Sequence, residues 1–139
     1  MTDGKGAFAA PAEDDSDHFA VHVDREKRCL HIAMRGHWTD AIFDDYAATL
    51  RAAETIMRTL PAPTHTLVDS RSFEMQSPML AARFPALIAE LSLGESRRVA
   101  LVTQSPLGRM QARPTGELVN ARYFRAMENA ADWLFSDEA

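Results

Sequence analysis

Side chains that could bind an anion are concentrated in two stretches of this 139-residue chain. Arginine guanidinium groups donate paired hydrogen bonds to phosphates and carboxylates, and serine and glutamine side chains add further polar contacts. The residue types therefore predict a binding site for a small anionic or lipid-like ligand. The candidate ligand-binding residues are Asp69, Ser70, Arg71, Gln76 and Ser77 in the first stretch and Gln104, Ser105, Arg109 and Arg113 in the second, with Ser72 and Gln111 beside them.

The same residues also fit purely structural roles. Ser77 and Ser105 each stand directly before a proline, which is typical of the cap and first turn of a helix. Asp69 could accept a hydrogen bond from a loop amide, and the arginines could pair with acidic side chains. If the residues do bind a ligand, replacing Arg109 and Arg113 together by alanine should weaken binding and leave thermal stability nearly unchanged.

Motifs typical of an enzyme are absent from the sequence. The chain has no Walker-type phosphate loop, no Gly-x-Ser-x-Gly elbow, no His-Glu-x-x-His helix and no dinucleotide-binding fingerprint. A serine nucleophile needs a neighbouring base, and none of the five histidines has a spacing that points to a candidate serine. We therefore expect a binding module that is not an enzyme and that uses no cofactor.

The element expected first is a β-hairpin, because apolar side chains alternate at positions 19, 21 and 23 and again at positions 30, 32 and 34. If Asp24 pairs with Cys29, all six apolar side chains share one face, whereas a slip of one residue would turn them toward solvent. The same register places His22 opposite His31, with their Cβ atoms about 5 Å apart. Because no third ligand is near, we predict no metal site and interpret the histidines as a solvated or interface pair.

A helix, two strands and further helices are expected after the hairpin. Apolar positions that step by three and four predict a helix that begins at Thr39 or Asp40 and ends before Pro61. Apolar runs at residues 65–70 and 98–103 predict strands that are buried on both sides.

Prolines and glycines shape the expected second half of the chain. We expect a helix after Ser77 with a kink at Pro85, and a helix after Ser105 that Gly108 and Pro114 keep short. Residues 121–125 could form a last strand or extend the closing helix at residues 128–135.

The predicted fold is a mixed sheet of the α/β (α+β) class, with an N-terminal β-hairpin and then helix-connected parallel strands. It has about four to five strands, with helices packed on the sheet. In such sheets ligands gather outside the carboxyl ends of the parallel strands, beside the N-termini of helices. Both polar stretches follow predicted strands, so we expect them to lie near each other at this rim.

Charge is distributed unevenly along the chain. The net charge is −5, and the first 17 residues hold five acidic residues against one lysine, so the remainder is nearly neutral. We expect residues 1–17 to be a flexible acidic tail and residues 18–139 to be a single domain. A nearly neutral domain lacks the basic face that nucleic-acid binding requires, so no nucleic-acid partner is predicted.

Hydropathy and cysteine content indicate the compartment. The sequence contains no apolar run near the ~20 residues of a membrane span, and the first residues lack the pattern of a secretory signal. The single cysteine, Cys29, suits a reducing environment. We therefore predict a cytoplasmic protein without a membrane span.

Three stretches carry a resemblance to a known family: Leu67-Val68-Asp69-Ser70-Arg71-Ser72-Phe73, Val99-Ala100-Leu101-Val102 and Ala130-Ala131-Asp132-Trp133-Leu134. Together with the predicted order of elements, over roughly residues 18–136, they resemble the SpoIIAA-like family, which is related to STAS domains. The resemblance implies a fold shared with anti-sigma-factor antagonists and with Sec14-type lipid-carrying domains, and it implies no reaction.

The resemblance also implies candidates for phosphorylation. In the antagonists, a serine at the start of the helix after the central strand is phosphorylated within an Asp-Ser-Ser/Thr-Gly-like motif. This chain has Asp69-Ser70-Arg71-Ser72 without the glycine. Ser77 matches the family serine by its place at a helix start, and Ser70 matches by its neighbour Asp69.

Two functions of different classes follow. The first is a module that binds a small anionic or lipid-like ligand at the rim, with Phe73, Met75, Met79 and Phe84 as apolar walls; alternatively, these four side chains only close the core. The second is a protein–protein signalling adapter of the anti-sigma-antagonist type, switched by serine phosphorylation, which binds another protein or forms a homodimer. A pocket deep enough for an acyl chain favours the first, and a flat, exposed apolar patch favours the second.

Overall fold

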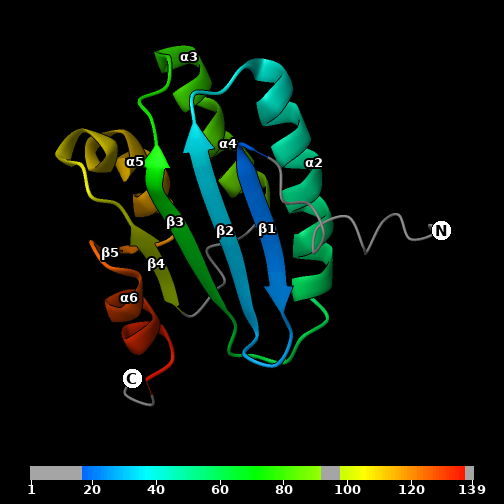
Figure 1. The fold of residues 1–139 in the computed structure, drawn as a ribbon. Coiled ribbons are helices and arrows are strands. Elements are labelled where there is room, and N and C mark those ends of the chain that lie inside the picture. Colours follow the sequence, from blue (N-terminus) through cyan, green and yellow to red (C-terminus); the bar gives the residue numbers. More distant parts are fainter. Residues whose placement is uncertain (1–16, 92–97, 137–139) are drawn as a thin grey trace.

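A computed structural model describes residues 17–91 and 98–136, and its five strands form one mixed sheet in the order β1-β2-β3-β4-β5 (Figure 1). β1 and β2 are antiparallel, and each later strand is parallel to its neighbours. The strands are β1 (Phe19–Asp24), β2 (Cys29–Gly36), β3 (His65–Phe73), β4 (Arg98–Val102) and β5 (Arg122–Phe124). The helices are α2 (Asp40–Met57), α3 (Pro78–Ala81), α4 (Arg83–Leu91), α5 (Pro106–Leu118) and α6 (Met127–Leu134). The predicted mixed sheet is confirmed.

The hairpin has the predicted register. Asp24 pairs with Cys29, and each apolar residue of β1 lies opposite an apolar residue of β2. Val21, for example, lies opposite Ile32. These side chains are buried against α2, while His22 and His31 lie opposite each other on the other face. The apolar alternation fixes this register because any slip would expose the buried set.

Helix α2 begins where the sequence predicts. Thr39 is its N-cap, and the Thr39 hydroxyl oxygen accepts a hydrogen bond from the backbone N–H of Ile42 at 3.3 Å. The inward stripe, which includes Phe43, Tyr46 and Leu50, is buried against the hairpin. This helix therefore covers the β1–β2 end of the sheet.

The helix predicted after Ser77 is broken into α3 and α4 at Ala82. Pro85 has no N–H to donate to the carbonyl of Ala81, and its ring would collide with that carbonyl in a continuous helix. The predicted kink is therefore confirmed, as a break one turn ahead of the proline.

Helix α5 has 13 residues, so the prediction that Gly108 and Pro114 keep it short is wrong. Gly108 lies in the first turn, where its N–H donates to the Ser105 hydroxyl at 3.1 Å. Pro114 removes the donor that would bond the carbonyl of Met110, but Pro114 and Met110 are exposed, so water can bond that carbonyl instead.

The two faces of the sheet carry separate apolar clusters. The larger cluster joins β1 and β2 to α2 and α4, and α5 packs beside α4. The smaller cluster, on the opposite face, joins Cys29, Leu67, Ala100 and Val102 to α6. Residues 122–124 form a strand parallel to β4, so the strand alternative for residues 121–125 is correct.

The predicted acidic tail, residues 1–17, lies outside the described residues except for Asp17. Among the helices that are described, none combines the length and the apolar character needed to span a bilayer.

Candidate functional site

The first polar stretch begins in strand β3, which ends at Phe73, three residues later than predicted, and Gln76 and Ser77 follow in the loop before α3. Because successive side chains of a strand point to opposite faces, Asp69 and Ser70 are separated by the sheet. Ser70 lies on the face of the larger cluster, and its hydroxyl donates to the carbonyl of Val102 at 2.9 Å. β3 and β4 are neighbours, as predicted, but the side chains of Asp69 and Ser70 do not share one site.

Asp69 forms an ion pair with Arg71. The Nε and Nη2 atoms of Arg71 donate to the two carboxylate oxygens of Asp69, each at 2.9 Å. These bonds with Arg71 lower the pKa of Asp69, although partial burial of the carboxyl opposes the shift. Arg71 would have to leave this partner in order to bind a ligand anion.

Gln76 is buried and links three parts of the fold. Its Oε1 accepts from the backbone N–H of Trp38 at 2.8 Å, and its Nε2 donates to the carbonyls of Gly36 at 3.0 Å and Glu74 at 2.8 Å. The backbone N–H and C=O of Gln76 each bond the side-chain amide of Gln111 on α5, both at 2.9 Å. The structure therefore brings Gln76 and Gln111 together, and Gln76 fastens the β3–α3 loop to α5.

Ser77 and Ser105 are both helix caps. The Ser77 hydroxyl oxygen accepts from the N–H of Leu80 at 3.2 Å, and that of Ser105 accepts from the N–H of Gly108 at 3.1 Å. Both serines are also exposed. Both serines therefore act as helix caps, as the structural interpretation of the sequence predicted. Both side chains also remain accessible to solvent.

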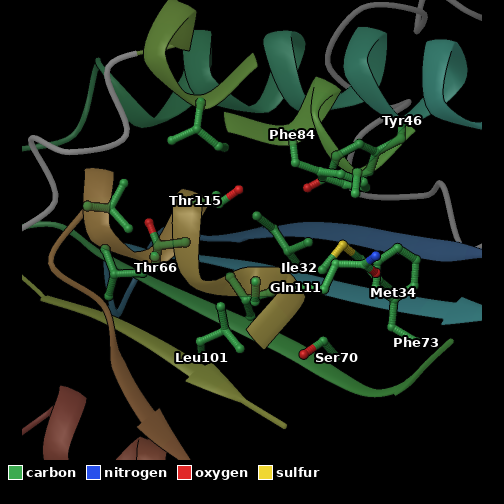
Figure 2. A pocket seen from close by; sticks show the side chains of 17 residues that line it. Ile32, Met34, Tyr46, Thr66, Ser70, Phe73, Phe84, Leu101, Gln111 and Thr115 are labelled. Carbon is green, nitrogen blue, oxygen red and sulfur yellow. The ribbon is translucent and has the colours of Figure 1, made fainter. Parts of the chain in front are cut away.

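A cavity of about 90 Å³ lies between the sheet and helices α4 and α5 (Figure 2). Strands β2, β3 and β4 supply its floor, and helices α2, α3, α4 and α5, with Val119 after α5, supply the rest of its wall. Most of the lining is apolar: the floor includes Ile32, Thr66, Val68, Val99 and Leu101, and the helical wall includes Phe84, Ile88, Ala112, Thr115 and Gly116.

Aromatic rings form one end of this cavity. Phe84 lies at the centre of the group, with its ring centroid 4.9 Å from that of Phe43, 5.8 Å from Phe73 and 6.0 Å from Tyr46. Burial raises the pKa of the Tyr46 hydroxyl. The Phe84 pairs with Phe43 and Phe73 are edge to face, an arrangement that stabilises aromatic contacts.

Two of the four side chains that the sequence predicted as apolar walls do not line the cavity. Phe73 and Phe84 line the cavity, but Met75 and Met79 are 49% and 85% exposed and do not touch it. The prediction for the two methionines is wrong because α3 breaks away from α4 and carries Met79 toward solvent. The sequence pattern could not show where this short helix points.

The second polar stretch borders a cleft of about 240 Å³ at the carboxyl ends of β4 and β5. Gln104, Ser105 and Arg109 line it, as predicted for a rim site, together with Tyr123 and Arg125. The guanidinium of Arg109 lies 4.5 Å from the centroid of the Tyr123 ring, so the cation stacks on the ring at the edge of the cleft. Arg113 is exposed one turn farther along α5 and does not line the cleft.

Tyr123 and Arg125 are absent from the sequence-based site. They reach the cleft because β5 pairs with β4, a contact between residues about 20 positions apart that local patterns do not reveal. The Tyr123 hydroxyl is buried and has no hydrogen-bond partner among the described residues. Burial raises the pKa of this hydroxyl, and the charges of Arg109 and Arg113 oppose the shift.

The two histidines of the hairpin lie beside each other with their ring centroids 6.0 Å apart. Burial lowers the pKa of His31, and the charge of Asp24 opposes the shift. Within residues 17–91 and 98–136, no group of three or more histidine, cysteine, aspartate or glutamate side chains is placed to hold a metal ion.

Comparisons with known proteins bear on the fold. No family model matches the sequence, and no curated protein sequence matches it. The structure is similar to the crystal structure of an uncharacterised protein of the DUF3478 family with a SpoIIAA-like fold, from Shewanella loihica. The two chains are 19% identical with a TM-score of 0.64, over 87% of this chain and 97% of the other. The chain therefore has a SpoIIAA-like fold, as the resemblance in the sequence implies.

Proposed function

We propose that this chain is a non-enzymatic module that binds a small, mostly apolar, lipid-like molecule in the cavity beneath α5. The carrying observation is the apolar cavity itself, which lies on the sheet and is walled by α2, α3, α4 and α5. Apolar pockets with few polar groups are typical of sites that bind small molecules. The proposed binding involves no chemical reaction of the bound molecule.

The size of the cavity supports a ligand over a packing defect. Its volume of about 90 Å³ is several times the ~15 Å³ that one water molecule needs. At about 24 cal/mol per Å³, an empty cavity of this volume costs on the order of 2 kcal/mol of stability. An apolar molecule would recover that free energy by restoring dispersion contacts with the walls.

The polar groups of the cavity favour an apolar occupant. The Ser70 hydroxyl is bonded to the carbonyl of Val102, and the Gln111 amide is bonded to the backbone of Gln76. The cationic cleft at Ser105 and Arg109 shares no lining residue with the cavity. An anionic ligand group would therefore suit the cleft, and an apolar body suits the cavity.

The test first compares the native and denatured masses of the protein and then fills the cavity by a substitution. Protein purified gently from its own cells should show a native mass larger than its denatured mass if a molecule is bound. Purified protein should also bind xenon, an apolar atom small enough for a cavity of this volume, in xenon NMR. Ala112→Leu, which adds a side chain into the cavity, should abolish xenon binding, whereas Ala86→Leu on the exposed side of α4 should not.

Two results would overturn this proposal. One is an absence of both extra native mass and xenon binding in the wild type. The other is equal xenon binding by the Ala112→Leu and Ala86→Leu variants. The double change Arg109→Ala with Arg113→Ala then tests the cleft separately, because it should weaken only a ligand with an anionic group.

A signalling adapter of the anti-sigma-antagonist type is the second candidate. Its support is the exposure of Ser77, whose phosphorylation would add charge at the start of α3. Ser70 is only partly accessible and donates its hydroxyl proton to the carbonyl of Val102, whereas Ser77 is exposed and its hydroxyl only accepts a bond, so Ser77 is the better substrate for a kinase. A covalent phosphate on Ser77 that survives denaturation would support the adapter function, and unmodified Ser77 in protein from its own cells would count against it.

A further inference from the structure

The exposed apolar side chains of the molecule are gathered in one region. Within residues 17–91 and 98–136, five large apolar side chains are exposed, and all five lie on α5 or on the neighbouring segment at residues 75–79. They are Met75, Met79, Leu107, Met110 and Leu118. Such a concentration on one region typically marks a protein–protein or membrane contact.

The geometry of α5 arranges three of these side chains into a stripe. Leu107, Met110, Pro114 and Leu118 step by three and four, so they share one face of the helix. This face is exposed, while Gly116 is buried on the side of the cavity. The solvent-facing side of a helix is ordinarily polar, so the apolar stripe is not explained by the fold of one copy.

The loop before α3 is fixed to α5 beside this stripe. Gln76 and Gln111 are joined by two hydrogen bonds of 2.9 Å, so Met75, which adjoins Gln76 in the chain, lies close to α5. We call the stripe together with Met75 the α5 patch. Methionine side chains adapt their shape to a partner, which suits a contact surface.

Charged side chains border the stripe in one row. Arg109, Arg113 and Glu117 follow at steps of four, so they form one line along the exposed side of α5. If two α5 helices pack antiparallel about a two-fold axis near residue 113, Arg109 of each copy faces Glu117 of the other, and the two Arg113 side chains face each other at the axis. Two opposite-charge pairs then flank one like-charge pair at the rim of the contact.

We propose that the α5 patch binds a second copy of this chain through antiparallel packing of the two α5 helices. A two-fold contact uses the same surface on both copies, so it needs a surface that is complementary to itself. The apolar stripe satisfies this condition, and so do Arg109 and Glu117 at the two ends of the row, although the central Arg113 meets its own copy. The proposal does not depend on what occupies the cavity.

The size of the patch limits the expected strength. A helix of 13 residues is about 20 Å long. A contact built on one such helix lies at the lower end of specific interfaces, so we expect a weak, reversible dimer.

The test measures sedimentation velocity while the protein concentration rises from about 1 to 300 µM. We expect the 15.5-kDa monomer to convert into a dimer over this range. Met110→Ser should raise the dissociation constant at least tenfold, and Glu117→Arg should do the same because it makes the row entirely positive. The double exchange Arg109→Glu with Glu117→Arg should restore the dimer. Asp45→Arg, on the exposed side of α2, changes the net charge equally and should have no effect.

Circular dichroism confirms that each variant is folded before its mass is interpreted. A wild type that stays monomeric throughout this range overturns the proposal, as does a dimer that Met110→Ser leaves unchanged. Binding of the monomer to vesicles of phosphatidylglycerol, lost in Met110→Ser, would assign the patch to a membrane and also overturn it. If the double exchange fails to restore the dimer, the antiparallel arrangement of the two α5 helices is wrong.

Discussion

Gly116 of α5 packs against Tyr123 of β5, and we expect Gly116→Ala to destabilise the protein. A Cβ atom at residue 116 would lie 3.1 Å from the Tyr123 Cζ and would overlap its hydroxyl oxygen. Overpacking of this kind costs about 1–3 kcal/mol, and alanine recovers about 1 kcal/mol over glycine inside a helix. The expected net loss in the free energy of unfolding is therefore up to about 2 kcal/mol.

Tyr123→Phe should act in the opposite direction. It removes a hydroxyl that is buried without a partner among the described residues, and such a group costs about 1–3 kcal/mol. We expect the single change to be neutral or to stabilise by up to about 1 kcal/mol. Adding Gly116→Ala to this background should then cost less, because the oxygen that the new methyl group meets is gone.

Urea denaturation of the wild type, both single variants and the double variant gives the coupling energy directly. We expect at least about 1 kcal/mol of coupling, since independent sites add to within about 0.5 kcal/mol. Gly108→Ala, also on α5, is the control and should show no coupling to Tyr123→Phe, since its Cβ would meet Thr103 and Ser105 instead. Additive effects of Gly116→Ala and Tyr123→Phe would refute the proposed steric contact.

Three further predictions concern buried polar groups. Burial lowers the pKa of His31, so its contribution to stability is present above about pH 6.5 and is lost as the pH falls below that value. His31→Gln should flatten this part of the stability curve, and His22→Gln should flatten it less, because it removes only a charge that adds to the effect of burial on His31. Gln76→Ala should lower the free energy of unfolding by about 2–3 kcal/mol because it leaves the buried N–H of Trp38 unpaired, and a loss below about 0.5 kcal/mol in urea denaturation would contradict this role. Burial raises the pKa of Cys29 to about 12, so a disulfide reagent at pH 8 should label it only after denaturation; rapid labelling of the native protein would be inconsistent with its buried position.

Much of the fold could be predicted from local patterns. Alternation of apolar residues fixed the register of the hairpin down to the pairing of Asp24 with Cys29. Thr39, Ser77 and Ser105 were recognisable as caps because a small polar residue precedes each helix, directly before a proline in two cases. These features depend on residues only a few positions apart.

The candidate site was predicted only in part. Asp69 and Ser70 are neighbours in the sequence, yet the longer strand β3 puts their side chains on opposite faces of the sheet. Met75 and Met79 have the composition of a pocket wall but are exposed. In each case the residue type is informative, and the direction of the side chain is set by how far its strand or helix extends.

What the sequence by itself determined are the elements whose signals are local: the hairpin, the helix caps, the break before Pro85 and the two central strands. Only the tertiary structure decided where distant segments meet. The pairing of β5 with β4 brings Tyr123 and Arg125 to Arg109, and the packing of α5 over the sheet encloses the cavity and leaves Met110 exposed. These contacts join residues far apart in the chain. They are stabilised by burial of apolar surface that several distant segments supply together, so no short stretch of sequence predicts them.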